Sequence, residues 1–83
     1  MDTTKETKLA LYYSKYCFFC QKVLTFMRGG DFDVELRNTS DREHAQALMA
    51  GGGKTQVPCL RIEQANGDVQ WMYESDDIIR YLG

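Results

Sequence analysis

Apolar and polar residues follow one another along the first half of the chain in a pattern that predicts a strand, a helix and a second strand. Residues 9–13 form a short apolar run suited to a buried strand. Between residues 18 and 28 apolar side chains recur at helical spacing, and Gly29-Gly30 ends the pattern. The apolar stripe of this helix consists of Phe19, Val23, Leu24, Phe26 and Met27. Residues 33–37 alternate at period two and predict a strand parallel to the first, because a helix links the two.

A capping pattern predicts the second helix. Ser40 followed three residues later by Glu43 has the form of a capping box, in which each side chain satisfies a free backbone N–H at the start of a helix. Apolar residues continue the helix through Met49, and the run Gly51-Gly52-Gly53 predicts its end. The predicted helix is short and has only a weak apolar face.

The last third of the chain predicts a hairpin followed by a helix. Residues 60–63 alternate between apolar and charged side chains, and Asn66-Gly67 marks a tight hairpin into residues 69–73. Ser75 is a favourable N-cap residue. The two aspartates that follow it would lie in the first helical turn, where acidic residues are common. Apolar residues at helical spacing then predict a helix that closes the chain.

These elements follow the order βαβαββα, which predicts one α/β domain over residues 1–83, with residues 1–7 as a flexible lead-in. The expected architecture is a four-stranded mixed sheet flanked by three helices. The formal charge is −2, from 10 basic and 12 acidic residues, and no basic cluster favours nucleic acid as a partner. The N-terminus is polar and no apolar run reaches membrane-spanning length. We therefore expect a soluble, cytoplasmic monomer that binds no membrane.

Cys17 and Cys20 stand where the first strand gives way to the first helix. Residues three apart share one face of a helix, so the two sulfurs would lie within reach of a disulfide. A thiol at a helix N-terminus meets free backbone N–H groups and the positive end of the helix dipole, both of which favour the reactive thiolate. Three cysteines are an odd number and too few for a disulfide scaffold, so the pair indicates redox chemistry.

Two other interpretations of the cysteines stay open. The pair could be two buried thiols on a core helix, since free cysteine is among the most buried residue types. A zinc site would have to use Cys17, Cys20, His44 and Cys59, whose spacings match no common zinc finger. His44 is more simply a solvated or partly packed residue of the second helix.

Three stretches carry a resemblance to a known family. They are Cys17-Phe18-Phe19-Cys20 between a strand and a helix, Thr55-Gln56-Val57-Pro58, and Tyr73-Glu74-Ser75-Asp76-Asp77-Ile78. In this order the chain resembles the glutaredoxins, small thioredoxin-fold oxidoreductases that use glutathione, over residues 8–83. The last two stretches are equally similar to the N-terminal glutathione-binding domain of glutathione transferases. The resemblance implies a thioredoxin-like (glutaredoxin) fold, with glutathione as co-substrate and no required metal.

The resemblance also implies a glutathione-dependent thiol–disulfide oxidoreductase. Cys17 would be the nucleophile and Cys20 the resolving thiol, acting on protein disulfides and on glutathionylated proteins. Two alternatives belong to other classes. Some glutaredoxins hold a [2Fe–2S] cluster between two subunits, with the first cysteine of each and two glutathiones as ligands. A transferase N-terminal domain is the other alternative, although the chain ends at Gly83 without the helical second domain that forms the electrophile pocket.

The implied glutathione site is made of three groups of residues. In the resembled family the bond that matches Val57-Pro58 is cis, and the Val57 backbone pairs with the cysteinyl part of glutathione. The γ-glutamyl carboxylate would bind the helix N-terminus at Ser75, while Glu74 or Asp76 pairs its ammonium group. Lys15 would lie near the first cysteine or meet the glycine carboxylate. The full implied set is Lys15, Gln56, Val57, Pro58, Glu74, Ser75 and Asp76.

Two positions depart from the family pattern. Glutaredoxins commonly have a lysine three residues before the first cysteine, where this chain has Ser14, and Lys15 is one residue closer. Phe18-Phe19 stands where many glutaredoxins have Pro-Tyr, which places an apolar surface next to the nucleophile. Of these residues we expect Phe19 to pack in the core. We expect Cys59, which follows the proline, to be a buried structural thiol.

Overall fold

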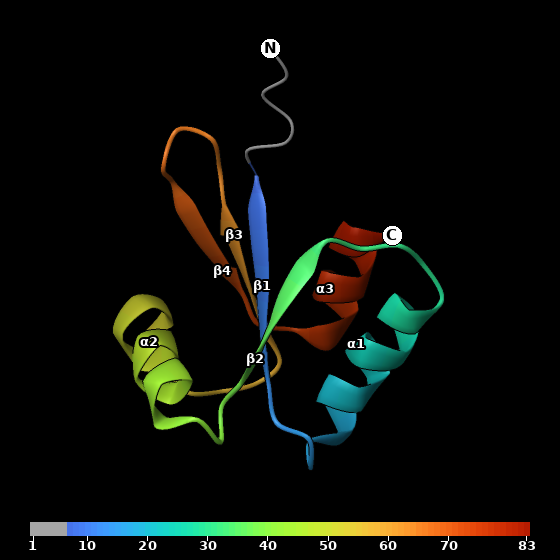
Figure 1. The fold of residues 1–83 in the computed structure, drawn as a ribbon, viewed down its shortest axis with the longest axis horizontal. Coiled ribbons are helices and arrows are strands. Elements are labelled where there is room, and N and C mark those ends of the chain that lie inside the picture. Colours follow the sequence, from blue (N-terminus) through green and yellow to red (C-terminus); the bar gives the residue numbers. More distant parts are fainter. Residues whose placement is uncertain (1–6) are drawn as a thin grey trace.

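The computed structural model describes residues 7–83, so the predicted lead-in lies outside the described residues except for Thr7. The elements are β1 (Lys8–Tyr13), α1 (Phe18–Arg28), β2 (Val34–Asn38), α2 (Arg42–Gly52), β3 (Cys59–Glu63), β4 (Val69–Met72) and α3 (Ser75–Leu82). The strands form one sheet in the order β2-β1-β3-β4, in which β1 and β2 are parallel and the other pairs antiparallel (Figure 1). The predicted order βαβαββα and the mixed four-stranded sheet are confirmed.

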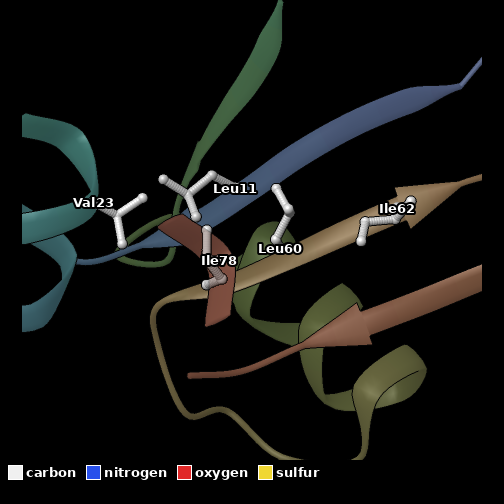
Figure 2. Close-up of a cluster of buried hydrophobic side chains, with 5 residues drawn as sticks. All are labelled: Leu11, Val23, Leu60, Ile62 and Ile78. Atoms are coloured by element: carbon white, nitrogen blue, oxygen red, sulfur yellow. The ribbon is translucent and has the colours of Figure 1, made fainter. Parts of the chain in front are cut away.

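One face of the sheet carries the main core, under α1 and α3. Leu11 of β1 and Leu60 of β3 are register partners in the two central strands, and both are fully buried. Val23 of α1 and Ile78 of α3 close over them, and Figure 2 shows these side chains gathered between the helices and the sheet. The core therefore fixes α1 and α3, whose N-caps are Cys17 and Glu74, against the same face.

The other face of the sheet is covered by α2 (Figure 1). Tyr12 and Cys59, which are register partners, are buried there together with Leu48 of α2. Trp71 and Tyr73 pack against this cluster from the β4 side. Cys59 is buried as expected, on the face opposite to the main core.

The glycines at the end of α2 allow it to approach β4 closely. A Cβ built on Gly51 would overlap the indole ring of Trp71. Replacing glycine by alanine in an exposed helix interior normally stabilises by about 1 kcal/mol. Here the ring would have to move, so we expect Gly51→Ala to lower the free energy of unfolding by about 1–3 kcal/mol. Urea denaturation measures the change.

Gly29→Ala is the matched control for this prediction. Gly29 has a φ of −83°, and a Cβ there would meet only the Phe26 carbonyl oxygen, at an ordinary contact distance of 3.5 Å. We expect this variant to change stability by no more than about 0.5 kcal/mol. Equal effects of the two substitutions would contradict the importance of the contact between Gly51 and Trp71.

Two helix starts differ from their predicted caps. The N-cap of α2 is Asp41, whose carboxylate accepts the Glu43 N–H, and not Ser40. The Asn38 side chain accepts both the N–H and the hydroxyl of Ser40, which holds Ser40 in a turn before the helix. The N-cap of α3 is Glu74 and not Ser75, which is buried as the first helical residue. No side chain caps α3.

Candidate active site

Cys17 caps the first helix with its own sulfur. The residue has extended backbone angles, and the N–H of Cys20 donates to Cys17 Sγ at 3.2 Å. The strand β1 and the loop after it carry Cys17 to this position, where the side chain stays partly exposed. The Cys17 sulfur therefore lies at the positive end of the helix dipole and remains accessible to a reactant.

Cys20 lies one turn into α1 and is fully buried. Burial, together with a hydrogen bond that the Cys20 thiol donates to the neighbouring Cys17, raises the pKa of the Cys20 thiol to about 12. The backbone N–H of Ser14 donates weakly to Cys20 Sγ at 3.5 Å. Neither cysteine is in a disulfide, and Cys20 carries its proton at neutral pH.

The loop before β3 comes next to Cys17 at the N-terminal end of α1. The Cys17 thiol donates to the Val57 carbonyl oxygen, with a sulfur-to-oxygen distance of 3.8 Å. The Val57-Pro58 peptide bond is cis, as the family resemblance implies. Within residues 7–83 the Val57 backbone N–H has no hydrogen-bond acceptor. The Val57 carbonyl therefore lies beside the sulfur, and the N–H of the same residue is available to a ligand.

A cavity of about 220 Å³ joins this loop to the start of α3. Its lining comes from three separate parts of the chain: Phe19, Gln56, Val57, Pro58, Tyr73, Glu74, Ser75 and Asp76. Six of the seven residues implied as glutathione ligands line this cavity together, while Lys15 does not. A larger hollow of about 380 Å³ between α1 and β2 contains neither cysteine nor any of the implied ligands.

The first turn of α3 offers backbone donors to the cavity. Because no side chain caps α3, the N–H groups of its first turn are free of a capping acceptor. The N–H of Ile78 is the first to bond within the helix, to the Glu74 carbonyl. Helix N-termini of this kind bind carboxylates.

The two candidate carboxylates at this helix start differ in their partners. Asp76 is paired with Lys22 of α1 at 2.7 Å, and this hydrogen bond lowers the pKa of the Asp76 carboxyl. Glu74 is exposed and forms no ion pair within the described part of the chain. Glu74 is therefore the carboxylate that can pair an ammonium group without giving up an existing partner.

Phe19 does not pack in the core, so that expectation is wrong. Its side chain is 55% exposed, and the buried positions of α1 are Cys20 and Val23. Side chains of a helix point back toward its N-terminus, so a residue in the first turn reaches toward the open end of the helix. Phe19 there lines the cavity.

Sequence reasoning missed Tyr73 and Lys22. Tyr73 lines the cavity and directly precedes Glu74, so the Tyr73-Glu74-Ser75 run was the signal available for it. Lys22 reaches Asp76 across 54 positions of sequence, and no local pattern indicates that pair. Lys15 is exposed, with its Nζ 5.8 Å from the centre of the Tyr16 ring.

The other candidate metal ligands lie apart. His44 Nδ1 is 3.1 Å from the Asn38 carbonyl oxygen, and its ring meets Tyr12 edge-on. In residues 7–83 no group of three or more histidine, cysteine or acidic side chains could hold a metal ion.

None of the helices in this range is long and apolar enough to cross a membrane.

The two buried thiols, Cys20 and Cys59, should make the free energy of unfolding fall at alkaline pH. Burial raises the pKa of Cys20 from 9.0 to about 12 and that of Cys59 from 9.0 to about 11. In the unfolded chain both thiols ionise near pH 9, so above this pH the native state retains protons that the unfolded state has released. Their contribution to the free energy of unfolding is complete below pH 9. It falls between pH 9 and 11 by up to about 1.4 kcal/mol per pH unit for each thiol.

We expect Cys59→Ala to weaken this alkaline loss of stability. The variant lacks one of the two thiols, so its free energy of unfolding should fall less steeply than that of the wild type above pH 9. Urea denaturation at neutral pH and at several pH values up to about 11 compares the two slopes. Parallel pH profiles for both proteins would contradict the prediction, whatever their difference at neutral pH.

Comparisons with known proteins found one matching family model and several solved structures of similar fold. Residues 11–83 match the family model for the glutathione S-transferase N-terminal domain. A search of curated protein sequences gave no match. Among solved structures, a disulphide isomerase from Xylella fastidiosa Temecula1 superposes with a TM-score of 0.66 at 13% identity, over 95% of this chain and 77% of that one.

Two further structures show the same fold. A mutant thioredoxin from Halobacterium salinarum NRC-1 has a TM-score of 0.60 at 20% identity, over 96% of this chain and 74% of that one. A maleylacetoacetate isomerase from Anaeromyxobacter dehalogenans 2CP-1, with bound GSH in its active site, has a TM-score of 0.52 at 20% identity. The match covers 93% of this chain and 37% of the isomerase. These similarities establish a thioredoxin-like fold.

Proposed function

The chain belongs to the family of glutathione S-transferase N-terminal domains, and from this premise we propose that it is a glutathione-dependent thiol–disulfide oxidoreductase. One observation carries the proposal: the Cys17 thiol caps α1 beside the carbonyl of Val57, and Val57 lines a cavity that ends on the uncapped start of α3. A reactive sulfur and a place for a peptide-like thiol are thus combined in one site. The substrates are protein disulfides and protein–glutathione mixed disulfides.

Glutathione fits this cavity by the chemistry of its three parts. The Val57 N–H and C=O pair with the cysteinyl backbone in antiparallel fashion, a one-residue strand addition. The γ-glutamyl carboxylate accepts from the free N–H groups at the start of α3, and Glu74 pairs the adjacent ammonium group. Gln56 lines the same cavity beside Val57 and donates its side-chain amide to the glycine carboxylate.

Deglutathionylation then proceeds in two exchanges. The Cys17 thiolate attacks the glutathionyl sulfur of the mixed disulfide, a new S–S bond forms, and the protein substrate leaves as a thiolate that takes a proton from water. A second glutathione, as thiolate, attacks the glutathionyl sulfur held on Cys17. Oxidised glutathione leaves and the Cys17 thiolate is regenerated. The balance is one glutathione thiol oxidised for each substrate thiol released, because the other half of the oxidised glutathione comes from the mixed disulfide itself.

Cys20 serves a second route, for disulfides between two protein cysteines. Cys17 attacks one sulfur and remains joined to the substrate, and the Cys20 thiolate then attacks Cys17 Sγ and releases the second substrate thiol. The internal disulfide that results is reduced by two glutathiones. Because burial raises the pKa of Cys20 to about 12, this step requires the proton to leave Cys20 as its sulfur attacks. The route through Cys20 should therefore be the slower one at neutral pH.

A coupled assay tests the proposed function. Wild-type protein is mixed with glutathione, glutathione reductase, NADPH and the mixed disulfide of glutathione with 2-mercaptoethanol, and NADPH loss is followed. We expect turnover that saturates with glutathione. A protein that stays inactive here, but whose internal disulfide is reduced by thioredoxin reductase, would be a thioredoxin-like donor and would overturn the proposal.

The family match also favours a second candidate, the glutathione-binding half of a transferase. In such a domain the cavity would hold glutathione for attack on an electrophile, and neither cysteine would be needed. Conjugation of glutathione to 1-chloro-2,4-dinitrobenzene separates the two functions. A conjugation rate that survives Cys17→Ser, without disulfide reduction by the wild type, would establish the transferase interpretation.

A further inference from the structure

Three aromatic side chains stand exposed around the nucleophile. Tyr16 is 89% exposed, Phe18 76% and Phe19 55%. They account for three of the seven large apolar side chains that are exposed in residues 7–83, and Cys17 lies among them. Exposed aromatic rings gathered at one place on a surface mark an interaction site. We call Tyr16, Phe18 and Phe19 the aromatic patch.

From this we propose that the aromatic patch is a docking surface for protein segments whose reactive cysteine is flanked by large apolar residues. The inference rests on the proposed function and names its substrate class. The closeness of the patch to Cys17 determines what binds there. Any substrate whose sulfur reaches Cys17 Sγ also brings the residues next to its cysteine over the patch. Consecutive Cα atoms are about 3.8 Å apart, so the side chains next to the substrate cysteine lie within reach of Tyr16 and Phe18.

The patch is continuous with the glutathione cavity. The rings of Phe18 and Phe19 meet edge-to-face with centroids 5.4 Å apart, and Phe19 also lines the cavity. A glutathionylated substrate would therefore be held at both ends of its disulfide. The glutathione part lies in the cavity, and the protein part lies over Tyr16 and Phe18. The cavity gives the glutathione requirement, while the patch distinguishes one protein substrate from another.

The charges within the stretch that carries the patch do not favour a basic segment. Between Ser14 and Val23 the only charged residues are Lys15 and Lys22, and Lys22 is paired with Asp76. No acidic side chain in that stretch would attract a basic segment. Large apolar residues beside the substrate cysteine lose exposed surface on docking and cover that of Tyr16 and Phe18, which strengthens binding. Serine or glycine at the same positions covers little of it.

A pair of peptides tests the docking surface. Both carry a central cysteine glutathionylated on sulfur, one with leucine on each side of it and the other with serine. For wild-type protein we expect kcat/KM to be at least about tenfold higher for the leucine peptide. The double variant Tyr16→Ser/Phe18→Ser should reduce this preference to roughly twofold or less. Neither residue lines the cavity, so the rate with the 2-mercaptoethanol mixed disulfide should stay unchanged.

Tyr81→Ser is the matched control. Tyr81 is an exposed aromatic residue of α3, 44% exposed, and it does not line the glutathione cavity. This variant should keep the full preference for the leucine peptide. Equal kcat/KM for the two peptides with the wild type would overturn the proposal of a docking surface. So would a preference that survives the double substitution. If the proposed function itself is wrong, the result is distinguishable, because the wild type would then turn over neither the peptides nor the 2-mercaptoethanol mixed disulfide.

Discussion

Replacing Cys17 by serine should lower glutathione-dependent disulfide reduction by on the order of 10³-fold or more, because the hydroxyl cannot form the mixed disulfide on which both routes depend. The sulfur is the only one of the two in the Cys-x-x-Cys pair that is partly exposed. It also accepts the Cys20 N–H and lies beside Val57. The coupled assay with the 2-mercaptoethanol mixed disulfide measures the loss directly.

Cys20→Ser is the matched control, because it removes a sulfur from the same helix turn. Deglutathionylation needs only Cys17, so this variant should keep most of the wild-type rate with the mixed disulfide. It should lose the route that ends in an internal disulfide, and an intermolecular disulfide with a protein substrate should accumulate on non-reducing gels. Substantial turnover by Cys17→Ser, or an equal loss in both variants, would contradict the assigned roles.

The element order could be predicted because each segment has a clear period. Apolar residues at helical spacing gave α1 with its observed bounds, Phe18–Arg28, and the hairpin signal at Asn66-Gly67 correctly joined β3 to β4. Gly67 has a φ of 95°, a conformation that glycine adopts at little cost, which is why this signal is dependable. Local chemistry decided these features, and local chemistry can be read from sequence.

Features that depend on distant contacts could not be predicted in this way. Periodicity placed Phe19 on the apolar face of α1, but only the fold shows that the first turn of this helix reaches the cavity and leaves the ring half exposed. The pairing of Lys22 with Asp76 spans two helices and has no local signal. Both predicted caps were misplaced by one residue. The Asp41 carboxylate takes the role predicted for Ser40, whereas at α3 the N-cap position falls on Glu74 and no side chain caps the helix.

The position of the site was predictable only through the family resemblance. Nothing in residue spacing brings Val57 to Cys17 or joins both to the start of α3, and it is the sheet that does so. The register of β1 with β3 places Tyr12 opposite Cys59, so the loop after β1 and the loop before β3 leave the same end of the sheet. Cys17 and Val57 stand in these two loops.

Glutathione recognition should depend more on Glu74 than on Asp76. Glu74 forms no ion pair in the described residues, whereas Asp76 is held by Lys22 and would have to leave it to meet an ammonium group. Glu74→Gln removes the charge and keeps the side-chain size. We expect it to raise the glutathione concentration needed for half-maximal turnover by roughly ten- to a hundredfold, which is the effect of losing a charge-assisted hydrogen bond.

The neighbouring acids provide the comparison within one helix turn. Asp77→Asn makes the same charge change, but Asp77 pairs with Arg80 and does not line the cavity, so its glutathione dependence should stay within about twofold of wild type. For Asp76→Asn we expect an increase in the required glutathione concentration that is intermediate between those of the other two variants, because the substitution leaves Lys22 without its partner next to the site. In all three variants the alkylation rate of Cys17 by iodoacetamide should be nearly unchanged, since the sulfur is held by α1 and Val57. If Glu74→Gln and Asp76→Asn, alone and combined, keep the wild-type glutathione dependence in a folded protein, glutathione does not bind at the start of α3. A thioredoxin-like electron donor would then describe the protein better.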